Sequence, residues 1–99
     1  MNRNDMLRGL YDLIILATIK KNNGLLSQYA VYKQINSSYE DYNIKINEST
    51  IYDAIRRLRN NQYLVIKDKK MVITSSGEEY YSDKVDEWEK VKEFVALFI

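Results

Sequence analysis

The chain has 99 residues, 45% of them hydrophobic and 29% charged, and a formal net charge of +1, so we expect one small globular domain with a single core. It contains neither cysteine nor histidine, which excludes a disulfide framework, a thiolate zinc site and histidine-based acid–base catalysis. We therefore expect a protein that is not an enzyme and binds no metal or cofactor.

The unbroken apolar run of the first predicted helix extends from Leu13 to Ala17. It is far shorter than the roughly 20 residues that a membrane-spanning helix needs. No small-residue cleavage site of a signal peptide follows it. We expect a cytoplasmic protein that does not enter a membrane.

Two helices are predicted in the first third of the chain. Apolar residues, Leu10, Ile14 and Ala17 among them, recur at three- and four-residue spacing and predict a helix over about residues 5–21. Gly24 is suited to end it. Ser27 is a candidate N-cap for a second helix that ends near residue 36. Residues 36–43 indicate a loop, and residues 44–46 either a short strand or an extended lead-in.

The third helix is predicted over residues 47–60. Asn47 is a favoured N-cap residue. Ile51, Ile55 and Leu58 fall at positions i, i+4 and i+7, and Ala54 lies beside them. These four side chains form one apolar stripe, which we expect to face the core.

A hairpin and a long helix complete the chain. Residues 64–67 and 71–74 are rich in β-formers and are joined by the charged sequence "DKK". Ser75 or Ser76 is expected to cap a final helix that continues to the C-terminus. This order of elements is that of a winged helix-turn-helix, a mainly α fold with a two-stranded wing. We expect a DNA-binding domain over 1–74 and a dimerisation helix over 75–99, within one globular unit.

The face of the third helix opposite its apolar stripe carries the residues best suited to DNA. Arginine bonds bidentately to the guanine edge in the major groove, so Arg56 is the expected base contact. Arg57 is expected either to contact a phosphate or to form an ion pair, and Arg59 to be replaceable on the surface. Tyr52 is either a DNA contact or a half-buried packing residue, and Asp53 a local partner of an arginine. The expected DNA-binding residues are Ser49, Thr50, Tyr52, Arg56, Arg57, Lys67, Lys69 and Lys70.

The charges are unevenly distributed along the chain. Residues 54–73 hold six bases against one acid, a net +5, whereas residues 74–99 hold three bases against seven acids, a net −4. A local basic patch releases counterions from a polyanion even when the whole chain is nearly neutral. The alternative is that both segments are ordinary solvated faces.

The final helix carries an apolar strip too long for a small domain to cover. We expect it to pair with the first helix in a twofold dimer, with Trp88 as an anchor, and to place two third helices about 34 Å apart. The alternative is that the helix folds back on its own domain. The expected interface residues are Leu10, Ile14, Val85, Trp88, Val91, Val95 and Phe98.

Four segments resemble the PadR family of winged-helix transcriptional regulators, and the resemblance spans nearly the whole chain. It implies a dimeric transcriptional repressor that binds a palindromic site on double-stranded DNA, with DNA contacts from Thr50 and Tyr52. Some members of the family also respond to a small-molecule effector. The chain has Asp53 and Gln62 where the family usually has proline and glycine. The matching segments are "LRGLYDLIILATI" at 7–19, "QYAVYKQI" at 28–35, "INESTIYDAIRRLRNNQYLV" at 46–65 and "MVITSSGEEYY" at 71–81.

Two other functions remain open. A plasmid or viral DNA-segregation protein, such as the AspA-like proteins, has the same fold and would spread along DNA from a repeated site. A winged helix can also serve as a protein-interaction module that binds through its final helix. The leading hypothesis is a homodimeric, sequence-specific DNA-binding protein that acts as a transcriptional repressor.

Overall fold

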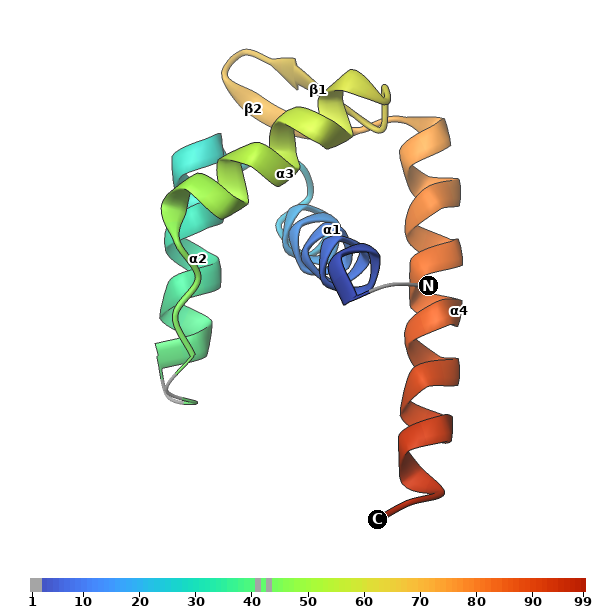
Figure 1. The fold of residues 1–99 in the computed structure, drawn as a ribbon. Coiled ribbons are helices and arrows are strands. Elements are labelled where there is room, and N and C mark those ends of the chain that lie inside the picture. Colours follow the sequence, from blue (N-terminus) through green and yellow to red (C-terminus); the bar gives the residue numbers. More distant parts are fainter. Residues whose placement is uncertain (1–2, 41, 43) are drawn as a thin grey trace.

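The computed structural model describes the backbone of residues 3–40, 42 and 44–99, and the side chains of residues 8–37, 42 and 44–99. These residues form four helices and one two-stranded antiparallel sheet, so the expected winged-helix fold is confirmed. In chain order the elements are α1 (Arg3–Lys21), α2 (Gln28–Glu40), α3 (Glu48–Asn60), β1 (Leu64–Lys67), β2 (Lys70–Ile73) and α4 (Ser75–Ala96) (Figure 1).

Helix α1 is the centre of the molecule and contacts α2, α3, α4 and β2. The predicted α3 stripe is confirmed, since all four of its residues are buried. On α1 the fully buried side chains are Ile15, Leu16 and Ile19, whereas Leu10, Ile14 and Ala17 are only half-buried. The apolar stripe predicted for this helix therefore includes residues of a second apolar face, which the core covers only in part. The core consists of Ile15, Leu16, Ile19, Val31, Ile35, Ile46, Ile51, Ala54, Ile55, Leu58, Leu64 and Met71.

Helix α2 begins where expected and ends later. The amide of Ala30 donates to Ser27 Oγ at 3.2 Å, which confirms the predicted N-cap. The helix continues to Glu40 rather than ending near residue 36, because the polar stretch contains neither proline nor glycine to stop it. Residues 41 and 43 of the expected loop lie outside the described residues. Residues 44–46 form no strand.

The hairpin has a tighter turn than the sequence suggested. Lys67 pairs with Lys70, so β2 begins one residue earlier than expected and the turn consists of Asp68 and Lys69 alone. Both turn residues have positive φ, 51° and 66°, which is the backbone geometry of a two-residue type I′ hairpin. At the other edge of the sheet, the Met71 amide donates to the Leu26 carbonyl at 2.8 Å. This bond attaches the wing to the segment that joins α1 and α2.

The N-cap of α4 is Thr74 and not Ser75 or Ser76. Thr74 Oγ1 accepts a hydrogen bond from the Gly77 amide at 3.0 Å and donates one to the Gln62 carbonyl at 2.6 Å. Gly77 is buried against the chain that enters the wing, and a Cβ atom there would lie 2.1 Å from the Tyr63 carbonyl oxygen. The sequence suggests only that glycine is tolerated at this position, whereas the packing leaves no room for a side chain.

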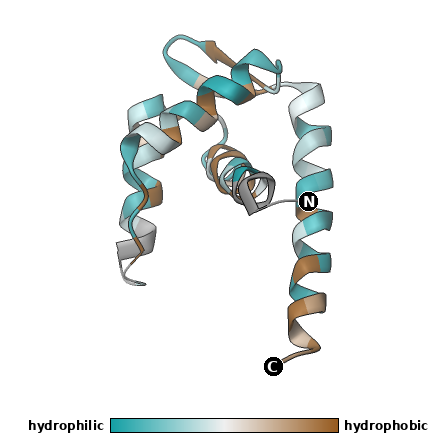
Figure 2. Cartoon of the chain, in the orientation of Figure 1, coloured by the Kyte–Doolittle hydropathy of each residue, from teal (hydrophilic) through white to brown (hydrophobic). Residues whose placement is uncertain are grey.

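Beyond its first turns, α4 runs past the rest of the molecule (Figure 1), and its C-terminal half carries most of the apolar residues in this helix (Figure 2). Trp88, Phe94 and Phe98 are 40%, 62% and 74% exposed. No helix in the described part of the chain is long and apolar enough to cross a membrane.

Candidate nucleic-acid interface

One face of α3 is free of packing contacts with the core. Ser49, Asp53 and Arg56 are exposed on it, and Thr50 and Tyr52 are half-buried at its margins. This is the face opposite the buried stripe, as the helical spacing predicts. Its hydroxyl and guanidinium groups are therefore accessible from solvent.

The ring of Tyr52 has a packing role. It lies against the core, with its centroid 6.2 Å from that of Tyr32. Burial, and then the hydrogen bond to the neighbouring Glu48 carboxylate, raise the pKa of Tyr52 above its ordinary value. The hydroxyl is protonated at neutral pH, as in any ordinary tyrosine, and donates to Glu48 in this structure.

Arg56 extends into solvent beside Asp53. Its Nη2 atom lies 3.3 Å from Asp53 Oδ1, and the two side chains are 70% and 63% exposed. An ion pair this exposed contributes only about 0 to 1 kcal/mol. Arg56 can leave this partner at little cost, so its guanidinium is available to another acceptor.

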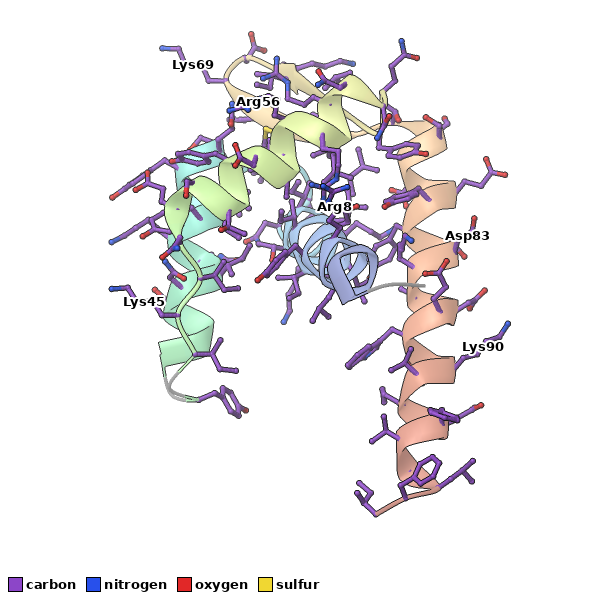
Figure 3. All side chains as sticks on the ribbon, viewed as in Figure 1. Arg8, Lys45, Arg56, Lys69, Asp83 and Lys90 are labelled. Atoms are coloured by element: carbon purple, nitrogen blue, oxygen red, sulfur yellow. The ribbon has the colours of Figure 1, made fainter. Side chains whose placement is uncertain are left out.

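The hairpin tip adds a second group of cations on the same side of the molecule. Lys67, Lys69 and Lys70 are all exposed, and Asp68 is the only acid among them. In the view of Figure 3, Lys69 at the hairpin tip and Arg56 on α3 both extend from the part of the molecule formed by α3 and the wing. The structure therefore brings the predicted lysines and the predicted α3 face to one surface.

A groove separates the end of α3 from β1. It has a volume of about 350 Å³. Its α3 wall carries two arginines and an asparagine, and its β1 wall is apolar. The lining residues are Arg56, Arg59, Asn60, Leu64, Val65 and Ile66.

The residues expected at a dimer interface divide into two groups. Trp88, Val95 and Phe98 are exposed, whereas the others are partly covered by their own chain. Phe94 is also exposed, and its ring makes an edge contact with that of Phe98 at 5.2 Å. The partly covered residues are Leu10, Ile14, Val85 and Val91.

Comparison with known proteins places this arrangement among transcriptional regulators. No protein-family model matches the chain. An uncharacterized protein of Lysinibacillus sphaericus, protein X, is 33% identical over 110 aligned positions, which cover all of this chain and 96% of that protein. The structure of a transcriptional regulator from Clostridium thermocellum has a TM-score of 0.78 and 30% identity, and covers all of this chain and 99% of its own. The chain belongs to the same family as these two proteins.

In this member of the regulator family, Arg57 is not on the exposed face. Its side chain turns toward α1 and donates to the carboxylate of Asp12, which is buried. The Tyr80 hydroxyl of α4 donates to the same carboxylate. The expectation of a DNA contact at Arg57 is therefore not supported by its position, and the alternative, an ion pair, is what the structure shows.

Tyr80 belongs to a small polar and aromatic cluster that the sequence did not reveal. Its ring stacks on that of Tyr63 with centroids 4.2 Å apart and an interplanar angle of 13°. The Lys84 ammonium lies 5.2 Å from the Tyr80 ring centroid. Asp12 could have been suspected from the sequence, because it is the only charged residue between Arg8 and Lys20, but nothing indicated its partners. The cluster links α1, α3 and α4 in this family member.

Proposed function

We propose that the protein is a homodimeric, sequence-specific DNA-binding protein of the PadR type that acts as a transcriptional repressor. The observation that carries the proposal is the exposed polar face of α3 beside the three lysines of the hairpin tip. A helix beside a basic hairpin matches the major groove and the flanking DNA backbone. Shared family membership with a transcriptional regulator supports the same conclusion.

Each group on this surface has a distinct role in the proposal. Arg56 reads a base edge, because a guanidinium is complementary to O6 and N7 of guanine. The hydroxyls of Ser49, Thr50 and Tyr52 contact phosphates or base edges near the start of α3. The lysines at 67, 69 and 70 contact the backbone and add affinity without sequence preference.

The dimer is proposed from the uncovered part of α4. Three large apolar side chains, Trp88, Val95 and Phe98, are exposed there, and the half-buried second apolar face of α1 includes Leu10 and Ile14. A second copy of the chain would cover both surfaces through a twofold interface. Such a dimer presents two copies of α3 to successive major grooves, and its DNA site is palindromic.

The test is selection of bound duplexes from a random pool at two salt concentrations. We expect one consensus with dyad symmetry and an affinity that falls with salt. Arg56→Ala should weaken the selected duplex more than a random-sequence duplex, by about 1 to 3 kcal/mol. Lys69→Ala should weaken both alike.

Three outcomes contradict this proposal. A footprint that spreads from one site as protein is added supports DNA segregation instead of repression. Absence of salt-dependent DNA binding, together with a stable complex with another protein, supports an interaction module. Unchanged affinity of Arg56→Ala for the selected duplex removes the base-reading role of this residue.

A further inference from the structure

The groove between α3 and β1 presents hydrogen-bond donors and cations. Arg56, Arg59 and Asn60 line its α3 wall, and none of the described lining residues carries a carboxylate. Arg59 is exposed and has no ion-pair partner among the described residues. In contrast, Arg57 is held by Asp12 beneath the helix. The groove therefore contains a guanidinium that no other group in the described chain neutralises.

The backbone of β1 adds a donor on the same side. In a two-residue hairpin the pair next to the turn, Lys67 and Lys70, is hydrogen-bonded, and the following pair, Ile66 and Met71, is not. The Met71 amide confirms this register, because it points out of the sheet to the Leu26 carbonyl. The Ile66 amide must likewise point away from β2. It has no acceptor among the described residues, and Ile66 lines the groove.

We propose that this groove binds one phosphate of the DNA backbone, held by the Arg59 guanidinium together with the side-chain amide of Asn60 and the backbone amide of Ile66. The inference rests on the proposed DNA binding and assigns a site within it. One backbone strand separates a major groove from the adjacent minor groove. With α3 in the first and the hairpin tip at the second, that strand passes between α3 and β1. Planar guanidinium groups and free amides are the donors that recognise phosphate oxygens.

The first test is the salt dependence of binding to a random-sequence duplex and to the selected duplex. Arg59→Ala is expected to weaken both by the same factor and to reduce the slope of log affinity against log salt by about one. Lys90→Ala is the matched control, since it removes one exposed charge from α4, away from this surface (Figure 3). This control should leave the slope unchanged. Arg59→Gln also removes the charge but keeps a longer side chain than alanine, and it should change the salt slope as Arg59→Ala does. Thermal unfolding confirms that both variants fold.

The second test locates the phosphate. Neutral methylphosphonate linkages are placed one at a time along the selected duplex. One linkage in each half-site should weaken binding by the wild-type protein and have no further effect on Arg59→Ala. This loss of additivity is the signature of a direct contact.

The outcomes separate this inference from the function on which it rests. If Arg59→Ala binds both duplexes with the affinity and salt slope of the wild type, the phosphate site alone is overturned. Equal effects of every linkage on the wild type and on Arg59→Ala do the same. Absence of salt-dependent binding by the wild-type protein overturns the proposed function and this inference together.

Discussion

Arg57 of α3 is bonded to Asp12 of α1, a carboxylate that is only 3% exposed. The bond lies on the same side of α3 as the buried stripe that includes Ile51 and Ile55, so both favour one rotation of the helix about its own axis. Adjacent residues on a helix point about 100° apart. Holding Arg57 inward therefore keeps Arg56 directed to solvent, on the face proposed to meet DNA.

Asp12→Ala should destabilise the protein strongly. It leaves the Arg57 guanidinium and the Tyr80 hydroxyl without their acceptor. We expect a loss of about 2 to 3 kcal/mol in the free energy of unfolding, measured by urea denaturation. Asp53→Ala is the control, because it breaks the exposed pair with Arg56 and should cost less than about 1 kcal/mol. Equal effects of the two substitutions would contradict the role assigned to Asp12.

Stability above pH 10 should depend on Tyr80. Burial, and then the hydrogen bond to Asp12, raise the pKa of Tyr80 well above its ordinary value of 10.0. Below pH 10 both the folded and the unfolded chain keep the proton. At higher pH the unfolded chain loses it first, so the free energy of unfolding falls as the pH rises toward the folded pKa. Tyr80→Phe removes this contribution, and its stability, measured by urea denaturation, should fall less steeply with pH. Parallel pH profiles for the two proteins would refute the assignment.

Gly77→Ala should be poorly tolerated. The new Cβ would lie 2.1 Å from the Tyr63 carbonyl oxygen, a backbone atom that cannot move without displacing the wing. We expect a loss of at least about 2 kcal/mol, measured by thermal or urea unfolding. Gly9→Ala is the matched substitution in α1, where the nearest atom is the flexible Lys84 Nζ at 3.7 Å. That change should be neutral or stabilising by up to about 1 kcal/mol.

Gln62→Gly should stabilise the protein. Gln62 follows α3 with φ of 64°, in the left-handed region that glycine adopts without strain. Its carbonyl accepts from Thr74 and Ser76, and glycine keeps that carbonyl. We expect a gain of about 0.5 to 1 kcal/mol in urea denaturation, and no gain for Gln62→Ala, which retains a Cβ. A gain of equal size in both variants would show that the strain is not the cause.

Val95→Asp should disrupt the proposed dimer and leave the fold intact. Val95 is 48% exposed near the end of α4, so a charge there costs little in the monomer and much in a buried interface. Sedimentation velocity should show a shift to the monomer. Leu25→Asp is the control, since Leu25 is 63% exposed in the segment between α1 and α2. A wild-type protein that sediments as a monomer would contradict the proposed dimer directly.

The sequence predicts α3 well because its pattern has a single solution. Ile51, Ile55 and Leu58 are its apolar residues at helical spacing, and all are buried. Helix α1 is apolar on more than one face, so spacing alone did not distinguish the core side, with Ile15 and Leu16, from the half-covered side.

The candidate site shows a different limit. Arg56 and Arg57 are adjacent in the sequence, and only the packing of α1 beneath α3 determines which of them is free. The N-cap of α4 shows the same dependence on tertiary contacts. Thr74 takes that role because its hydroxyl accepts from the Gly77 amide, whereas the Ser76 hydroxyl donates to the Gln62 carbonyl across the start of the wing.

The stack of Tyr63 on Tyr80 attaches the segment between α3 and β1 to α4. Together with the shared Asp12 carboxylate, it leaves α3 little freedom to swing relative to α4. Two protomers joined through α4 would therefore hold their DNA-reading helices at a fixed distance and a fixed angle. Each base pair inserted between half-sites turns one of them by about 35° around the duplex. The proposed dimer would therefore select its DNA sites by the separation of their half-sites as well as by their bases.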